Sequence, residues 1–226
     1  MSDVRECQAS ASGWGAPDAA RKGGRIRAFE VHVCGNPWKA WVFLRLLTED
    51  GFEGGGECSL NGFARTTEAC FYELVPYFVE QRPEDYASIT RKMLTDMYSD
   101  AGQLHRGVVA AVELACLDIL GKRAGLPVHA LLGGKVREEV QAYGNGWYRQ
   151  GQIPVAFSGL ASIALHLGYT VLKCDPFGAL RSPISLCDWE TISIVCSELE
   201  RVPVTFALEV HQRLDLSDSL SLLRML

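Results

Sequence analysis

Apolar residues in the first half of the chain recur first at the spacing of strands and then at that of helices. Residues 25–33 and 40–50 read as two strands, and the second ends at Asp50 and Gly51, residue types that favour a chain reversal. We therefore predict two antiparallel strands. The glycine-rich stretch that follows, residues 54–63 (GGGECSLNGF), is typical of part of a lid over a binding site, although its three consecutive glycines also suit a flexible turn.

Helical spacing begins near Thr66. Apolar residues recur at helical intervals up to residue 91, with Pro83 as an interruption. Residues 106–125 form the strongest predicted helix, because Gly125 and the proline two residues later provide a helix stop. Strands followed by helices predict a small α+β unit.

The second half of the chain alternates strand-like and helix-like runs. Strand-like runs occupy 138–147, 169–178 and 204–213, and helical runs occupy 154–168 and 188–200. This order predicts a parallel sheet with helical crossovers. A doubly wound fold would begin in the same way, but the first loop, YGNGWYRQGQ, lacks the GxGxxG of a dinucleotide site, which favours a barrel.

Ionisable residues stand at the ends of the last two strand-like runs. Glu209, His211 and Arg213 are spaced two apart within the run 204–213, so their side chains are predicted to project from one face of this strand. Lys173 and Asp175 have the same spacing in the preceding run. Such groups suit the mouth of a barrel, although a strand-end ion pair or a solvated loop would explain each of them singly.

Composition narrows the classes of function. The chain has 226 residues, 48% of them apolar, and 22 basic against 27 acidic residues give a formal net charge of -5. Scattered basic residues argue against nucleic-acid binding, and no apolar run is long enough for a membrane span. The eight cysteines show no paired metal-ligand spacing. We interpret most of them as buried thiols of a protein in a reducing cytoplasm. Residues 1–25, rich in Ala, Ser and Gly, predict a disordered leader.

Three separated segments resemble one family. Residues 111–147 (AVELACLDILGKRAGLPVHALLGGKVREEVQAYGNGW), 168–178 (GYTVLKCDPFG) and 207–214 (ALEVHQRL) are similar to the mandelate racemase and muconate-lactonizing branch of the enolase superfamily, and most of all to acid-sugar dehydratases of the galactonate and mannonate type. The resemblance implies an α+β capping domain over 26–135. It also implies that 136–226 is the first part, about three strands, of a (β/α)₇β barrel.

The resemblance also implies roles for individual residues. Glu209 corresponds to the first of three carboxylate ligands of a Mg²⁺ ion, and His211 to the acid that protonates a departing hydroxyl. Lys173 and Asp175 correspond to acid/base or substrate-binding positions. Gln212 stands where relatives tend to have glycine.

Three further side chains are candidates for substrate binding. Arg213 would bind a substrate carboxylate or lie at the barrel rim. Asn145 and Trp147, at the end of the first predicted barrel strand, would line the pocket, although packing and turn roles explain them equally well.

The family chemistry removes a proton α to a carboxylate, forms an enediolate and eliminates a β-hydroxyl as water. The resemblance implies a small sugar acid as substrate, and homo-oligomers for full-length relatives. Only three of eight barrel strands fit into this length, so the later metal carboxylates and the α-proton base are missing and we expect no catalysis by this chain alone. A non-enzymatic fragment, and a racemase or cycloisomerase with Lys173 as base, stay as alternatives.

Overall fold

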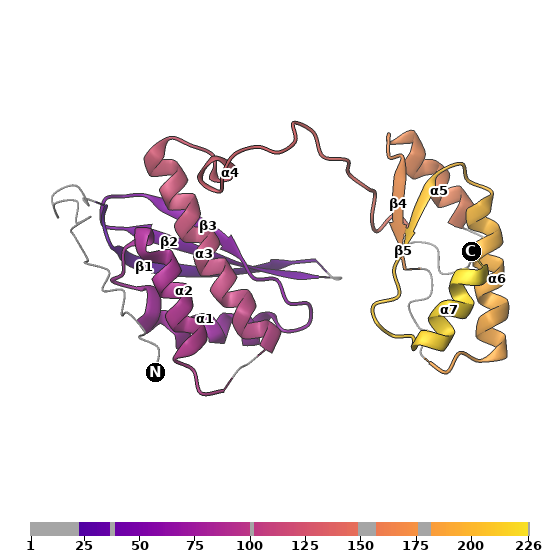
Figure 1. Cartoon of the computed structure of the whole chain (residues 1–226), viewed down its shortest axis with the longest axis horizontal. Coiled ribbons are helices and arrows are strands. Elements are labelled where there is room, and N and C mark those ends of the chain that lie inside the picture. Colours follow the sequence, from indigo (N-terminus) through magenta and orange to yellow (C-terminus); the bar gives the residue numbers. More distant parts are fainter. Residues whose placement is uncertain (1–22, 37–38, 100–101, 149–156, 176–181, 226) are drawn as a thin grey trace, which may run out of the picture. The chain divides into compact units, whose positions relative to one another are not determined.

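The computed structural model describes residues 23–36, 39–99, 102–148, 157–175 and 182–225. The chain divides into two compact units, 1–136 and 137–226 (Figure 1). All but the last three residues of the predicted leader, 1–25, lie outside the described residues. Among the described residues, no helix combines the length and the apolar character needed to cross a membrane.

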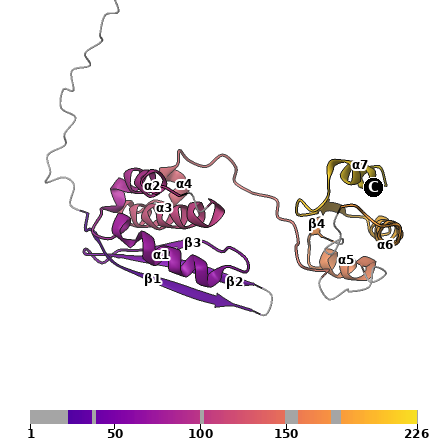
Figure 2. The same cartoon turned by 90° about the horizontal axis from the view of Figure 1, so that it is seen from below.

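The first unit is a three-stranded antiparallel sheet with helices on one face (Figure 2). The strands are β1 (Ile26–Gly35), β2 (Ala40–Thr48) and β3 (Glu53–Glu57), in that order across the sheet. The helical elements are α1 (Ala64–Phe78), η2 (Pro83–Asp85), α2 (Tyr86–Thr95), α3 (Gly102–Ala124) and α4 (Val128–Leu131). The predicted strand pair, the interruption at Pro83 and the long helix that Gly125 ends in the left-handed region (φ 65°) are all present.

The core of this unit follows from the alternation along β2. Val42, Leu44 and Leu46 are almost completely buried, and they lie in one cluster with Phe71 of α1 and Val112 of α3. Alternate residues of a strand point to one face, so one side of β2 packs under the helices. The hydrophobic burial of this face stabilises the unit.

The interpretation of residues 54–63 as part of a lid stays a prediction. The flexible-turn interpretation is wrong, because the three glycines belong to a strand, Glu53–Glu57. It pairs with β2 as β3, and the reversal lies just before it, where Gly51 has a φ of 86°. Gly54 and Gly56 are buried against α3, and a Cβ on either would overlap a backbone carbonyl oxygen, of Ala115 and Ala111 respectively. Glycine is therefore required because the helix backbone lies directly on the strand.

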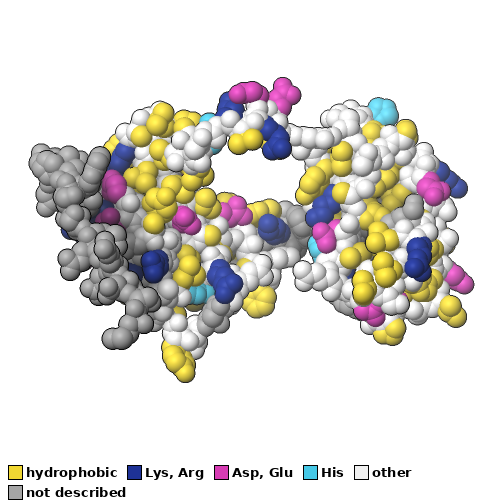
Figure 3. Space-filling model, in the orientation of Figure 1, with side chains coloured by type: hydrophobic (Ala, Val, Ile, Leu, Met, Phe, Trp, Pro, Cys, Tyr) yellow, Lys and Arg dark blue, Asp and Glu magenta, His cyan; other side chains and the backbone are white. Residues whose placement is uncertain are grey.

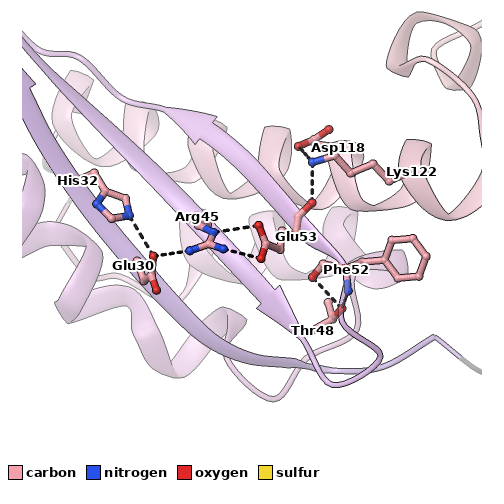
Figure 4. A network of polar contacts seen from close by, with 8 residues as sticks. All are labelled: Glu30, His32, Arg45, Thr48, Phe52, Glu53, Asp118 and Lys122. Atoms are coloured by element: carbon pink, nitrogen blue, oxygen red, sulfur yellow. Dashed lines mark hydrogen bonds and ion pairs between the residues drawn. The ribbon is translucent and has the colours of Figure 1, made fainter.

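A chain of polar contacts covers the other face of the sheet (Figure 4). Arg45 of β2 donates to Glu30 of β1 (2.9 Å) and to both carboxylate oxygens of Glu53 of β3. His32 lies 3.0 Å from Glu30. These cross-strand contacts join all three strands on the face opposite the helices (Figure 2).

The free edge of β3 is also partnered by side chains of α3. Asp118 accepts from the backbone N–H of Gly55 (2.9 Å), and Lys122 donates to the carbonyl of Glu53 (2.8 Å). Side chains that occupy the backbone groups of an edge strand make it a poorer template for pairing with another chain.

Arg123 joins the C-terminal end of α3 to three other segments. Its guanidinium lies 2.8 Å from Asp50 and 2.5 Å from Glu84, and it donates to the carbonyl of Gly24 (2.9 Å). Burial raises the pKa of Asp50, but hydrogen bonds from Thr48 and Arg123 outweigh it and hold that pKa at about 2.

The second unit is built on parallel pairing. β4 (Val171–Cys174) lies beside β5 (Thr205–Leu208), and α5 (Phe157–His166), α6 (Leu186–Glu200) and α7 (Leu216–Met225) are its helices (Figure 1). The first barrel strand predicted over 138–147 is reduced to a single parallel bridge between Gly144 and Leu172. Residues 138–143 are exposed and form no strand, so this prediction was too long.

Candidate functional site

Five ionisable side chains meet where β4 and β5 end. Lys173 lies on β4 and Asp175 directly after it, whereas Glu209, His211 and Arg213 follow β5. The two strands are parallel with Cys174 opposite Leu208, and Glu209 N–H extends the pairing by donating to the Cys174 carbonyl (2.9 Å). Carboxyl ends of parallel strands meet at one sheet edge, which brings the five side chains together. We call them the ionic cluster.

The local conformation differs from the predicted extended strand. β5 ends at Leu208, and His211 and Gln212 have φ values of 48° and 55°. Glu209 Oε1 accepts from the backbone N–H of His211 at 2.8 Å and closes this turn. Strand alternation therefore does not place the last two ionisable residues. The left-handed conformation at Gln212 is the one that glycine adopts without strain.

The ionic cluster is connected through its two carboxylates. Glu209 Oε2 lies 3.3 Å from Lys173 Nζ, and Glu209 Oε1 lies 3.3 Å from His211 Nδ1. Asp175 Oδ1 accepts from Arg213 at 2.5 Å, and its Oδ2 lies 3.5 Å from His211 Nε2. The backbone N–H of His211 and the Lys173 ammonium lower the pKa of Glu209. The imidazole therefore lies between two carboxylates.

Exposure separates the members of the ionic cluster. The side chains of Asp175 and Arg213 are 10% and 13% exposed, whereas that of His211 is 59% exposed. His211 is thus the most accessible group for an incoming molecule. The Asp175–Arg213 pair is a feature that the i, i+2 spacing did not predict, although the opposite charges at two neighbouring strand ends were a signal for it.

Asn145 and Trp147, the two candidates from the first predicted barrel strand, make contacts that differ from each other. Asn145 is exposed, and its Oδ1 accepts from the backbone N–H of Gly146 (2.8 Å), which is a turn contact. The Trp147 indole donates to the Lys173 carbonyl (2.9 Å), and its ring lies 6.0 Å from that of Phe206. These contacts fit the turn and packing alternatives, and Trp147 supports the strand that carries Lys173.

Comparison with known proteins identifies the family. Residues 24–133 match the N-terminal domain of mandelate racemase/muconate lactonizing enzymes. A solved structure of a provisionally assigned enzyme of that type from Labrenzia alexandrii aligns with a TM-score of 0.79 at 26% identity, over 89% of this chain and 59% of its own. Residues 24–133 therefore belong to the N-terminal domain of the mandelate racemase/muconate lactonizing enzyme family, and the chain is similar to enzymes of that family in the enolase superfamily. The predicted fold class, an α+β capping domain followed by the first part of a (β/α)₇β barrel, is confirmed.

Several curated relatives carry the name D-galactonate dehydratase. The D-galactonate dehydratase of Pectobacterium atrosepticum is 28% identical over 178 residues, which are 77% of this chain and 46% of the relative. The D-galactonate dehydratase of Verminephrobacter eiseniae is 32% identical over 145 residues, 63% of this chain and 37% of the relative. The chain thus spans less than half the length of these relatives, and the dehydratase resemblance is confirmed at the level of the family.

A Mg²⁺ ion, which the resemblance implies, does not fit the ionic cluster by itself. Magnesium takes near-octahedral oxygen coordination. Here both oxygens of Glu209 and both oxygens of Asp175 already lie close to a nitrogen of Lys173, His211 or Arg213. Within the part of the chain that the structure describes, no group of three His, Cys, Asp or Glu side chains could hold a metal ion.

A cleft of about 570 Å³ lies on the other side of β5. Its walls come from α6, the segment that follows it, β5 and α7, and its lining residues are Cys196, Leu199, Glu200, Val202, Pro203, Val204, Phe206, Leu208 and Leu223. Hydrophobic side chains also gather on the visible surface of this unit (Figure 3). No member of the ionic cluster lines the cleft, so it belongs to the packing side of the strand.

Proposed function

We propose that this chain carries the capping domain and the first catalytic side chains of a dehydratase for sugar acids of the galactonate type. One observation carries the proposal: in a chain whose curated relatives are named D-galactonate dehydratase, an accessible imidazole lies beside Glu209 and Asp175 at the carboxyl ends of neighbouring parallel strands. That edge is where barrel enzymes place their chemistry.

His211 is proposed as the proton donor to the departing β-hydroxyl. An imidazole can donate a proton from a ring nitrogen to an oxygen within hydrogen-bond reach, which is what a departing hydroxyl needs. Its two ring nitrogens face Glu209 Oε1 and Asp175 Oδ2, and these contacts would hold the ring in position. Most of the side chain stays accessible to a substrate.

The other members of the ionic cluster have supporting roles in this proposal. Glu209 is proposed as the first carboxylate ligand of the Mg²⁺ ion in a complete site. Asp175 is proposed to position the imidazole, and Arg213 to hold Asp175, since its guanidinium is committed to that carboxylate rather than directed at a substrate. Lys173 contacts Glu209, which gives no support to the alternative of a racemase with Lys173 as its base.

We also propose that these 226 residues do not catalyse the reaction alone. The ionic cluster does not fit Mg²⁺, and no α-proton base is assigned among the described residues. The missing groups would come from a segment that corresponds to the rest of the relatives' sequences. The match to the Pectobacterium atrosepticum enzyme covers less than half of that enzyme.

A chimera tests the proposal. Residues 26–226 would replace the corresponding part of the Pectobacterium atrosepticum D-galactonate dehydratase, and loss of galactonate would be followed together with formation of the 2-keto product. The chimera should dehydrate galactonate, whereas the isolated chain should not. His211→Asn in the chimera should abolish turnover, and His166→Asn, which changes an exposed histidine of α5, should not.

Two results would overturn the proposal. A folded chimera without any dehydration would remove the assigned activity. Unchanged dehydration in the His211→Asn chimera would remove this imidazole from the reaction while leaving the family assignment intact.

A further inference from the structure

The residue that follows each of the three asparagines of the chain determines how reactive that asparagine is. Asn61 and Asn145 precede glycine, whereas Asn36 precedes proline. The backbone nitrogen of the next residue can attack an asparagine side chain, and glycine leaves that nitrogen accessible because it has no side chain of its own. Proline has no backbone N–H and so blocks the same step. The sequence therefore selects two of the three asparagines.

Asn145 is held in the arrangement that this attack needs. The residue is exposed, and its Oδ1 accepts from the backbone N–H of Gly146 at 2.8 Å. This hydrogen bond keeps the attacking nitrogen beside the side-chain carbonyl whose carbon is Cγ. Gly146 has a φ of 81°, in the left-handed region that glycine enters without strain. Reacting groups that are already held side by side react faster than groups that must first meet.

Asn61 provides an internal comparison. It is exposed as well, and Gly62 has a φ of 82°. Among the described residues, however, no hydrogen bond joins the Asn61 side chain to the Gly62 N–H. The two Asn-Gly pairs thus share sequence, exposure and the sign of φ, and they differ in the contact that positions the reacting atoms.

We propose that Asn145–Gly146 is a site of spontaneous deamidation through a succinimide. The Gly146 nitrogen loses its proton to solvent and bonds to Cγ of Asn145, the bond from Cγ to Nδ2 breaks, and the amide nitrogen leaves as ammonia. Water then opens the succinimide at either of its carbonyls and leaves aspartate or isoaspartate. Water is the one co-reactant, and nothing is oxidised or reduced. The inference is independent of the proposed function.

The isoaspartate product would alter the main chain between two contacts with β4. The Gly144 carbonyl accepts from the Lys173 N–H (2.8 Å), and the Trp147 indole donates to the Lys173 carbonyl (2.9 Å). An isoaspartyl link runs through the side chain of residue 145, so it lengthens the main chain between Gly144 and Trp147. Both contacts should loosen, and amide hydrogen exchange in β4 should become faster.

Mass spectrometry of the full 226-residue chain tests the proposal, because each asparagine falls in a different tryptic peptide: 28–39, 46–65 or 138–149. In mildly alkaline buffer, the native chain should exchange an amide group for a hydroxyl in 138–149 at least about three-fold faster than in 46–65. Fragment ions should locate the change at residue 145, and 28–39 should stay unchanged. In urea, where the positioning contact is lost, 138–149 and 46–65 should react at similar rates.

Asn145→Asp is the matched control, because it keeps Oδ1 and the ordinary main chain but has no amide nitrogen to lose. Peptide 138–149 of this variant should keep its mass. Hydrogen exchange in β4 should rise on ageing of the wild type, with α6 as the reference, and stay constant in the variant. Circular dichroism reports whether the variant is folded.

The wild-type chain decides the question even if the variant is unstable. A native chain in which 46–65 reacts as fast as 138–149 would overturn the inference, as would the same ratio of rates in native buffer and in urea. Isoaspartate at residue 145 with unchanged exchange in β4 would refute the predicted loosening. The chimera tests the proposed function separately.

Discussion

Gly54→Ala should destabilise the first unit, whereas Gly55→Ala, one residue along the same strand, should not. Gly54 is buried under α3, where a Cβ would overlap the carbonyl of Ala115 and lie 2.7 Å from Cγ1 of Ile119. Gly55 faces the opposite side, and the nearest atom to a Cβ there is an oxygen of Asp118 at 3.9 Å. The two substitutions add the same methyl group to opposite faces of β3.

The magnitudes follow from these distances. Overpacking a well-packed site costs about 1–3 kcal/mol, and Gly54 belongs at the upper end because the obstacle is helix backbone that cannot rotate away. Replacing glycine by alanine also stabilises by about 0.4–1 kcal/mol through the entropy of the unfolded chain. Gly54→Ala should therefore lower the free energy of unfolding by about 1–2 kcal/mol, and Gly55→Ala should leave it unchanged or raise it by about 0.5 kcal/mol.

Urea unfolding of the full chain, followed by circular dichroism, measures the difference. Amide hydrogen exchange in peptides from β2, β3 and α3 assigns it to the first unit, and peptides from α6 serve as an internal reference. Equal stability of the Gly54→Ala variant and the wild type would refute the close approach of α3 to β3. Equal destabilisation by Gly54→Ala and Gly55→Ala would refute the assignment of the two residues to opposite faces.

Two further predictions concern ionisation. The folded-state pKa of Asp50, about 2, lies below its ordinary value of 3.8, so its contribution to stability should be complete above about pH 5 and lost as the pH falls toward 2. Urea unfolding between pH 2 and 6 should show this slope, and Asp50→Asn should flatten it; an equally steep slope in the variant would contradict the role of Asp50. Burial raises the pKa of Cys116 to about 12, so iodoacetamide at pH 8 should alkylate exposed Cys34 in the native chain but leave Cys116 unmodified until urea is added. Mass spectrometry gives both yields, and early labelling of Cys116 would show that it is not buried.

Periodicity predicted the elements of the first unit well, because its helices and strands obey local rules. Apolar residues at alternate positions predicted β2, and apolar residues at helical spacing followed by a glycine stop predicted α3. The same rules failed at residues 53–57. Glycine has no side chain to show which face is buried, and the reason for it at Gly54 and Gly56 is a helix more than 50 residues away along the chain. Only the tertiary contact makes these glycines part of a strand.

The ionic cluster was predicted from the alternation of side chains along an extended strand. The observed strand ends before these residues, and yet their side chains meet. The parallel register between β4 and β5 explains why, because it sets Cys174 opposite Leu208 and so brings together whatever follows each strand. The i, i+2 spacing was not needed for that result; the positions of Asp175 and Glu209 directly after the strands were sufficient.

The turn after β5 then determines which partner each side chain finds. With His211 in the left-handed region, its backbone N–H bonds Glu209 Oε1 and its ring lies between Glu209 and Asp175. An extended strand would leave that N–H free of Glu209. The role proposed for His211 thus depends on a local conformation that residue spacing does not encode, whereas the membership of the ionic cluster depends only on where two parallel strands end.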